Sequence, residues 1–397
     1  MVGCGSQHAP ERNQVMRLSK TQQITLKEEG DSAISVVSSA AISPNGNFLV
    51  ITDSHAGNVA VFRVSEGTLR NFISTSSAIT DSLAFSGVSS WATGSYSSLA
   101  DTRRNNPQAL KELRNSYAQA VFESDSTLAI LGDVRALFLP QGLQGDLSCY
   151  IAHRMFIERM NLSGQPSRVI FPDEKRPETT FARRGILLLD GRDGGYIVSV
   201  GNQDAVSRGR SDSAPTIALY DFTGKRKSNL SFIPEEFQRS SLGYNYLQPV
   251  GAVDSSGEIV IGYALTSKFT ELKSAKTIEI PAITSSNKAF FSSVTSKSKG
   301  GVKQFDVDLT NSSCIRSVEV TERGYFSFIV QHGTGDEAKR EAIEFSPSGD
   351  LVREAAFPDL TTLGSIRHIS YHASLKGFLC LSISREGKLI MSIFRWS

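Results

Sequence analysis

The chain has 397 residues and a formal net charge of +2, and 40% of its residues are hydrophobic while 21% are charged. This balance is typical of a packed protein and excludes a disordered chain. The near-neutral charge excludes a strongly basic protein that binds nucleic acid by neutralising phosphates, and no apolar run approaches the roughly 18 residues that span a bilayer as a helix.

The first residues, Met1-Val2-Gly3-Cys4-Gly5-Ser6, resemble the end of a bacterial lipoprotein signal. In that signal, small residues precede a lipid-modified cysteine and a polar stretch follows it. No basic and apolar segments precede Cys4 in this sequence, so either the start has been trimmed or the match is accidental. We expect residues 1–20 to be a polar tether that is lipidated at Cys4. This predicts a location in the cell envelope, at the outer membrane or in the periplasm, with a cytoplasmic protein as the alternative.

Four short runs that favour β-strands follow the tether, at residues 38–42, 47–52, 58–64 and 68–73. Tight turns separate them, and similar turns recur along the chain at Ser43-Pro44-Asn45-Gly46, Asp254-Ser255-Ser256-Gly257 and Ser346-Pro347-Ser348-Gly349. One strand-turn-strand unit that recurs at a regular spacing indicates a repeat fold.

Seven such units follow from the pattern, spaced by roughly 45 to 65 residues. The six units after the first begin near Asp81, Val134, Arg184, Gln248, Ile315 and Ile366. Several runs are apolar at every position, as in strands that are buried on both faces. Cys149 and Cys380 lie in such runs, so we expect buried free thiols and no disulfide framework.

Only one stretch predicts a helix. Asn106 can cap it, Pro107 suits its first turn, and Leu110, Leu113 and Tyr117 recur at i, i+3 and i+7.

The seventh unit has only three predicted strands before the sequence ends, at residues 368–371, 378–384 and 389–395. Residues 22–27 form a strand-like run before the first unit and have no partner there. We infer that this run completes the last unit and closes a ring, which removes exposed sheet edges.

This layout resembles the β-propeller superfamily, in the broad group of WD40-like, YVTN-like and lactonase-like propellers. Gly46, the apolar run Phe48-Leu49-Val50-Ile51 and Asp53 are similar to the blade signature of that group. The resemblance implies an all-β fold with one domain at residues 21–397. It would be a seven-bladed β-propeller, with six blades as the alternative, made of four-stranded antiparallel blades with the N-terminal strand closing the last.

In a propeller, the connections between second and third strands and between successive units open on one face. The long connections all fall in these two classes, at residues 98–116, 202–215, 268–301 and 332–339 within units and at 172–183 and 234–247 between units. Insertions in repeat proteins gather on one face, which is often the binding face. We therefore expect a ligand or partner to bind there, with tolerated surface decoration as the alternative.

Charged and aromatic side chains in these loops are the candidates for binding that ligand: Arg103, Arg104, Arg176, Arg183, Arg184, Arg208, Arg210, Tyr244 and Tyr246. The planar guanidinium suits carboxylate and phosphate groups, so an anionic ligand is one interpretation. Acidic residues nearby make a mixed, solvated surface the other.

No GxSxG, P-loop, GxGxxG or HExxH motif occurs in the sequence. The lactonase-like resemblance implies carboxylates that converge at the centre of the ring, in some cases with a divalent metal. The candidates for that role are Asp53, Asp133, Asp190 and Asp254. Asp190 and Asp254 stand where turns begin, which favours hydrogen bonds to their own backbone for these two. His368 and His372 lie roughly 13 Å apart along one strand, too far to ligate one metal, which favours a packing or surface role.

We therefore favour a non-catalytic protein that binds a protein or an extracellular ligand through the loop-bearing face. No cofactor, metal or nucleic-acid partner is expected, and contact with a membrane would occur only through a lipid at Cys4. The alternatives are a propeller hydrolase or lactonase with a divalent metal in the ring, and an intracellular scaffold.

Overall fold

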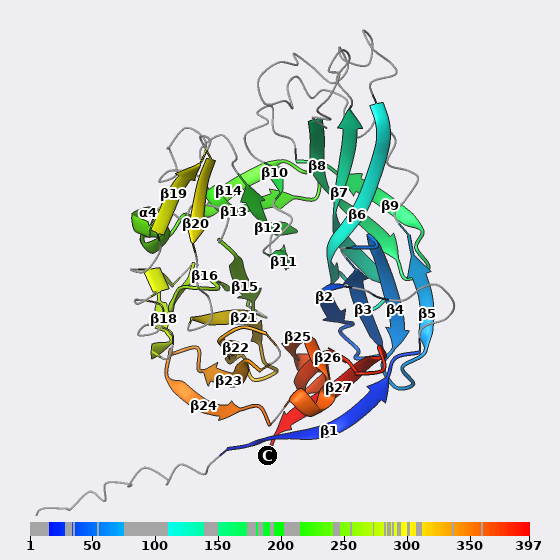
Figure 1. The fold of residues 1–397 in the computed structure, drawn as a ribbon. Helices are drawn as coiled ribbons and strands as arrows, with labels where there is room; N and C mark the ends of the chain where they lie inside the picture. Colours follow the sequence, from blue (N-terminus) through cyan, green and yellow to red (C-terminus); the bar gives the residue numbers. More distant parts are fainter. Residues whose placement is uncertain are drawn as a thin grey trace, which may run out of the picture.

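The computed structural model shows antiparallel β-sheets arranged around a common centre (Figure 1). It describes residues 16–27, 34, 36–53, 55–74, 110–138, 150–172, 180–181, 186–190, 194–201, 215–240, 247–254, 256–272, 274–281, 283, 287, 290–291, 295–299, 302–306, 312–335, 337–358 and 360–397. Within these residues the strands form six blades, so the chain is a six-bladed β-propeller and not the seven-bladed one that we favoured.

The first three blades follow one another along the chain. Blade 1 contains β2 (Val37–Ile42), β3 (Phe48–Asp53), β4 (Asn58–Arg63) and β5 (Leu69–Ile73). Blade 2 contains β6 (Leu110–Phe122), β7 (Thr127–Phe138), β8 (Tyr150–Asn161) and β9 (Pro166–Ile170). Blade 3 contains β11 (Leu187–Asp190), β12 (Gly195–Gly201), β13 (Pro215–Asp221) and β14 (Arg226–Phe232), and β10 (Thr180–Phe181) also pairs with β12.

The last three blades complete the ring. Blade 4 contains β15 (Pro249–Val253), β16 (Ile259–Tyr263), β17 (Lys268–Glu271) and β18 (Thr277–Glu279). Blade 5 contains β21 (Ser313–Val320), β22 (Phe326–His332), β23 (Lys339–Phe345) and β24 (Leu351–Ala356). Blade 6 contains β25 (Ser365–His372), β26 (Gly377–Ile383), β27 (Leu389–Trp396) and β1 (Leu18–Thr25). Among the described residues, the elements outside the blades are α4 (Glu235–Ser240), the hairpin of β19 (Thr295–Lys299) and β20 (Val302–Asp306), and two 3-10 helices, η3 (Thr361–Leu363) and η4 (Ala373–Leu375).

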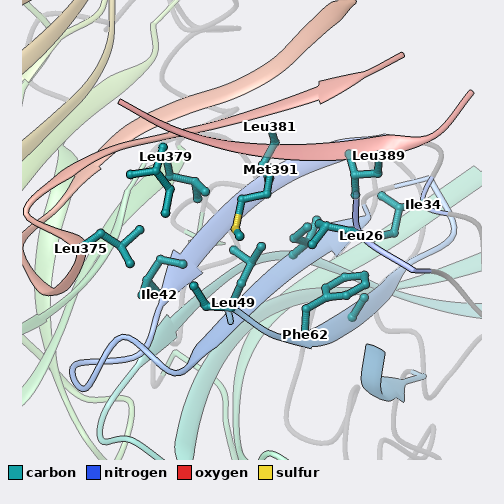
Figure 2. Close-up of a cluster of buried hydrophobic side chains, with 14 residues drawn as sticks. Leu26, Ile34, Ile42, Leu49, Phe62, Leu375, Leu379, Leu381, Leu389 and Met391 are labelled. Carbon is teal, nitrogen blue, oxygen red and sulfur yellow. The ribbon is translucent and has the colours of Figure 1, made fainter. Parts of the chain in front are cut away.

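The N-terminal strand closes the ring, as the sequence predicted. β1 pairs antiparallel with β27, from Leu18 opposite Trp396 to Thr25 opposite Ile390. Just beyond β1, Leu26 packs with Leu49 of blade 1 and Met391 of blade 6 in one buried cluster (Figure 2). The two ends of the described chain are therefore held in the same blade by backbone hydrogen bonds and by apolar packing.

Buried apolar clusters lie between all six pairs of neighbouring blades in the described part of the chain. Representative members, from the junction of blades 1 and 2 round to that of blades 6 and 1, are Val61 with Phe156, Leu131 with Tyr196, Ile197 with Ile261, Phe269 with Phe328, Ile329 with Phe378, and Leu381 with Leu49. Because every blade is covered on both faces, its inner strands can be apolar at successive positions.

The helix predicted from Leu110, Leu113 and Tyr117 is wrong, because these residues lie in strand β6. β6 pairs with β7 through register shifts between Leu110 and Glu112 and between Tyr117 and Gln119. A bulge inserts one residue and displaces the alternation of side chains along a strand. Apolar positions spaced by three and then four residues thus imitate the period of a helix.

The length of the strands in blade 2 explains the blade count. β6, β7 and β8 contain 13, 12 and 12 residues, and Val134, which we took as the start of a new unit, lies inside β7. Two predicted units are thus one blade. The other start in this region, Asp81, lies outside the described residues.

The connections divide between two rims, as expected. Turns that join the first to the second and the third to the fourth strand of a blade lie on one rim, here called the tight-turn rim, and each contains four or five residues. Connections between second and third strands and between blades lie on the opposite rim, the long-loop rim, and include residues 74–109, 139–149, 202–214 and 280–312.

Two loop assignments change within that rim. Residues 98–109 belong to the connection between blades 1 and 2, and not to a connection inside a blade. The predicted loop 268–301 contains strands β17 and β18, so its loop begins only after Glu279.

Candidate functional site

The binding candidates predicted from the sequence belong to connections on the long-loop rim. All nine lie outside the described residues: Arg103, Arg104, Arg176, Arg183, Arg184, Arg208, Arg210, Tyr244 and Tyr246. Cys4 and Cys149 also lie outside them, whereas Cys380 is a buried free thiol, as expected. The structure does describe the strand ends on either side of these connections, and these ends show at which rim each connection starts and finishes.

Two of the four candidate carboxylates hydrogen-bond their own turns. Asp53 Oδ1 accepts hydrogen bonds from the backbone N–H groups of His55 and Ala56 at 2.8 and 3.1 Å. Asp254 Oδ1 accepts from the N–H groups of Ser256 and Glu258 at 2.8 and 2.7 Å. Both carboxylates therefore stabilise local turns. This was the role favoured for Asp254, whereas the sequence analysis did not predict it for Asp53.

The other two candidates, Asp133 and Asp190, are buried. Asp133 Oδ1 accepts a hydrogen bond from Ser116 Oγ at 2.9 Å, and Asp190 is 5% exposed at the end of β11. In the part of the chain that the structure describes, no three His, Cys, Asp or Glu side chains are grouped so that they could hold a metal ion. No described helix is long and apolar enough to cross a membrane.

A row of polar side chains runs along β25, the innermost strand of blade 6. His368, Ser370 and His372 alternate along this strand and project to one side of it. Ser370 Oγ lies 2.8 Å from Nε2 of each histidine. The hydroxyl has one proton to donate and can accept two hydrogen bonds, so at least one of the two imidazoles donates to it. The sequence analysis placed the two histidines too far apart to ligate one metal, but it did not predict that Ser370 would connect them by hydrogen bonds.

Burial controls the ionisation of the side chains on the inner surface of the propeller, which is formed by the innermost strands such as β21 and β25. It lowers the pKa of His368 to about 4 and that of His372 to about 3, and the positive charge of Arg316 lowers the pKa of His368 further. On the neighbouring inner strand β21, burial raises the pKa of Glu319 to about 8. At neutral pH the imidazoles are neutral and Glu319 is mostly protonated, so these groups offer hydrogen bonds and not charge.

A second chain of hydrogen bonds lies at the long-loop rim of blade 5. Ser313 Oγ is 2.8 Å from His332 Nδ1, and His332 Nε2 is 2.8 Å from Glu341 Oε1. The order of groups is that of an activated nucleophile, but Ser313 is only 3% exposed. Its backbone is held by Asn287, whose side chain bonds both its N–H and its C=O group. The geometry therefore fits a latch that fixes the start of β21 better than an acyl-transfer site.

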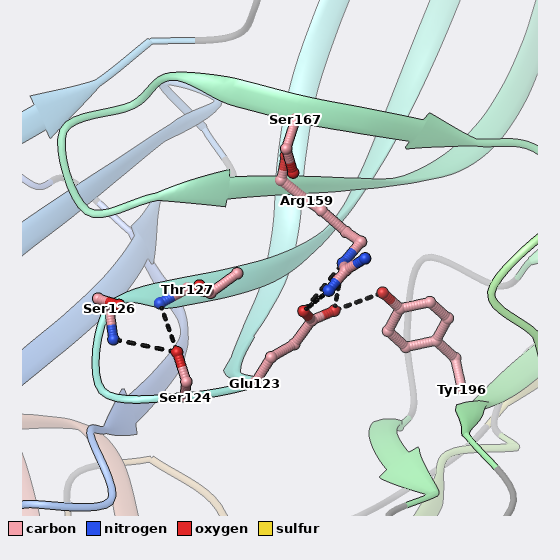
Figure 3. A network of polar contacts seen from close by, with 7 residues as sticks. All are labelled: Glu123, Ser124, Ser126, Thr127, Arg159, Ser167 and Tyr196. Atoms are coloured by element: carbon pink, nitrogen blue, oxygen red, sulfur yellow. Dashed lines mark hydrogen bonds and ion pairs between the residues drawn. The ribbon is translucent and has the colours of Figure 1, made fainter.

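At the tight-turn rim, a charged contact joins blades 2 and 3 (Figure 3). Arg159 Nε lies 2.9 Å from both carboxylate oxygens of Glu123, and Tyr196 Oη donates to Glu123 Oε1 at 2.5 Å. Burial and the neighbouring carboxylate raise the pKa of Tyr196, so the phenol remains a donor at all ordinary pH values. This arrangement is structural: it clamps two blades together.

No protein-family model and no curated protein matches the sequence. Solved structures resemble the fold. A protein from Bacteroides fragilis has a TM-score of 0.50 and 12% identity, over 96% of this chain and 95% of that chain. The PQQ-bound aldose sugar dehydrogenase of Streptomyces coelicolor has a TM-score of 0.46 and 10% identity, over 96% and 98%. The calcium-binding protein regucalcin from Agrobacterium tumefaciens has a TM-score of 0.42 and 8% identity, over 96% of both chains.

Likeness at such low identity establishes the fold and nothing about the ligand or the reaction. Propellers with different activities share this architecture, so function depends on the residues of the individual site. The sheet topology and the likeness to solved structures show that the chain is a β-propeller.

Proposed function

We propose that the protein is a non-catalytic binding protein of the bacterial cell envelope, attached by a lipid at Cys4. It would recognise a protein or another extracellular ligand through its long-loop rim. The proposal joins the lipoprotein-like residues at the start of the sequence to the asymmetry between the two rims.

The observation that carries the proposal is the place where the N-terminal segment meets the ring. β1 begins at the tight-turn rim, where Arg17 and Ser397 exchange backbone hydrogen bonds of 3.3 and 2.9 Å. A segment that leads from Cys4 to Leu18 spans at most about 50 Å when extended. A lipid at Cys4 would therefore hold the tight-turn rim towards the membrane and leave the long-loop rim facing away.

The chemistry of the tight turns also favours the opposite rim for binding. Asn161 Oδ1 accepts hydrogen bonds from the N–H groups of Ser163 and Gln165, and Asp221 Oδ1 accepts from those of Thr223 and Lys225. These turns use their side chains to satisfy their own backbone, which leaves fewer groups for a partner.

The anchor is tested by replacing Cys4 with Ser in cells that are fed an alkynyl fatty acid. We expect label on the wild-type protein and none on the variant, together with release of the variant from the membrane fraction. Cys380→Ser is the matched control and should keep both label and location, because Cys380 is buried in blade 6. Equal labelling of wild-type and Cys4→Ser protein would rule out the anchor.

The binding face is tested by a photo-crosslinking amino acid placed at exposed positions of each rim in the living cell. Thr334 and Arg385 are exposed on the long-loop rim, and Arg323 is exposed on the tight-turn rim. The proposal predicts one discrete adduct from the first two positions and none from Arg323. Adducts from position 323 alone would show that the partner binds at the tight-turn rim, which would contradict the proposal.

A further inference from the structure

Two exposed arginines occupy equivalent places on the innermost strands of blades 5 and 6. β21 has a register shift between Ile315 and Ser317, and β25 has one between Ile366 and His368. The extra residues at these bulges are Arg316 and Arg367, and both are exposed although their strands lie innermost. Bulges re-aim side chains and are frequent beside functional sites.

The two bulges face one another across the junction of the blades. β21 and β25 lie next to each other near the centre of the ring (Figure 1). Ser317 Oγ, one residue after the first bulge, donates to the carbonyl oxygen of Ile369, two residues after the second, at 3.3 Å. The positive charge of Arg316 also reaches His368, the residue that follows Arg367. These contacts place the two bulges, and with them Arg316 and Arg367, side by side on the two inner strands.

Neither positive charge is balanced by an acidic partner among the described residues. Arg316 donates from Nε to Gln331 Oε1 at 3.0 Å, and Gln331 donates from Nε2 to the carbonyl of Gly333 at 2.9 Å. This chain orients Arg316 through Nε, and no described residue accepts a hydrogen bond from its two terminal nitrogens. Arg367 makes no ion pair or side-chain hydrogen bond with any other described residue.

Two exposed positive charges on neighbouring inner strands, with no counter-charge among the described residues, favour binding of an anion. Each guanidinium can form two parallel hydrogen bonds to a carboxylate or phosphate group. The neutral row of His368, Ser370 and His372 begins one residue along β25 and supplies uncharged hydrogen-bonding groups beside the pair.

We propose that Arg316 and Arg367 form a binding site for an oxyanion ligand with about two negative charges, a phosphate group or a dicarboxylate, on the inner surface of blades 5 and 6. The site consists of residues other than the loop arginines predicted from the sequence. It does not rest on what the long-loop rim recognises, so either proposal can fail without the other.

The test is calorimetric titration of the full chain with inorganic phosphate and, separately, with succinate at low ionic strength. We expect saturable binding of at least one of them with one site per chain, and the one that binds more tightly identifies the ligand class. Arg367→Gln should weaken binding by roughly tenfold, since it removes charge-assisted hydrogen bonds. The double variant Arg316→Gln, Arg367→Gln should show no saturable binding.

Three further variants make the result specific. Arg316→Lys and Arg367→Lys keep the charge but lose the paired geometry, so each should bind with an affinity between those of the wild type and the Gln variant. Arg385→Gln removes an exposed arginine from the long-loop rim and should bind as the wild type does. Melting curves establish that each variant is folded, and Arg367→Gln should melt as the wild type does because Arg367 has no partner among the described residues.

Several results would overturn the proposal. The site does not exist if neither anion binds saturably, or if Arg367→Gln and the double variant bind as tightly as the wild type. An equal loss in Arg385→Gln would show that binding depends on the overall charge and not on this pair.

Discussion

Single carboxylates at blade junctions link side chains from two neighbouring blades. Glu344 of blade 5 accepts a hydrogen bond from Arg353 Nε at 2.7 Å and from Trp396 Nε1 of blade 6 at 2.6 Å. Arg353 lies 4.4 Å above the centre of the Trp396 ring. Since the Glu344 side chain is fully buried, its charge depends on these partners.

Removing this carboxylate should destabilise the protein strongly. Glu344→Leu leaves Arg353 and Trp396 without their acceptor, and we expect the free energy of unfolding to fall by about 3–5 kcal/mol. Chemical denaturation measures this. Glu386→Leu, which breaks the exposed ion pair with Lys388, is the control and should leave the midpoint unchanged. Equal midpoints for the Glu344 and Glu386 variants would contradict the role of the junction.

The inner-surface groups predict a stability maximum near pH 6.5. The pKa of Glu319 is about 8 in the folded chain against an ordinary value of 4.5, so the folded state binds more protons and stability falls as pH rises from 4.5 to 8. The pKa values of His368 and His372 are about 4 and 3 against 6.5, so the unfolded state binds more protons and stability falls as pH drops below 6.5.

Melting curves across pH separate these contributions. Glu319→Gln should remove the decline between pH 6.5 and 8, whereas His372→Gln should reduce the decline below pH 6.5 and leave the upper limb intact. If the slope of melting temperature against pH is unchanged in both variants, Glu319 and His372 do not control the pH dependence of stability.

At the scale of elements, glycines let large rings lie across neighbouring strands. A Cβ atom on Gly132 of β7 would lie 2.4 Å from Cζ of Phe156, its partner residue on β8. A Cβ atom on Gly262 of β16 would likewise lie 2.5 Å from the ring of Phe269 on β17. In both blades the phenylalanine ring occupies the space that a side chain at the glycine position on the second strand would need.

Gly132→Ala should therefore overpack blade 2 and lower the free energy of unfolding by about 1–3 kcal/mol. Adding Phe156→Leu removes the clash and should recover part of that loss, so the double variant should be more stable than the sum of the two single changes predicts. Denaturant titration of the three variants measures this coupling. Additive losses would contradict the close approach.

The strand units, the tight turns and the closing strand could be predicted because each depends on local composition and on counting partners. Residues 22–27 lacked a partner in blade 1 and the last blade lacked a fourth strand, so the ring closure followed. The same reasoning could not prevent the two errors in blade 2. Bulges in β6 changed the spacing of its apolar residues to that of a helix. β7, at twice the usual strand length, was divided between two predicted units.

The inner-surface groups were missed for a related reason. A bulge is a property of strand pairing, so the sequence alone does not show that Arg316 and Arg367 are extra residues. The available signal was the similarity of Ile315-Arg316-Ser317-Val318 to Ile366-Arg367-His368-Ile369, which places the same short pattern on two inner strands.

At the scale of the whole molecule, the ring depends on β1. Deleting residues 1–28 removes the ladder to β27 and the buried side chains of Leu18 and Leu26, and should lower the free energy of unfolding by about 4 kcal/mol or more. Deleting residues 1–16 keeps β1 and should leave the melting temperature unchanged. Similar melting curves for the two truncations would show that β1 is dispensable.

Closure by β1 also places the start of β1 at the tight-turn rim, opposite the long-loop rim, so the proposed function depends on it. The direct measurement is disulfide formation between cysteines introduced at Gln23 and Ser392, which are partners in the ladder. We predict that Gln23→Cys, Ser392→Cys forms an intramolecular disulfide in the folded protein, while Gln23→Cys, Arg395→Cys, which is out of register, does not. No disulfide in the first pair, or equal disulfide formation in both pairs, would contradict the closed ring.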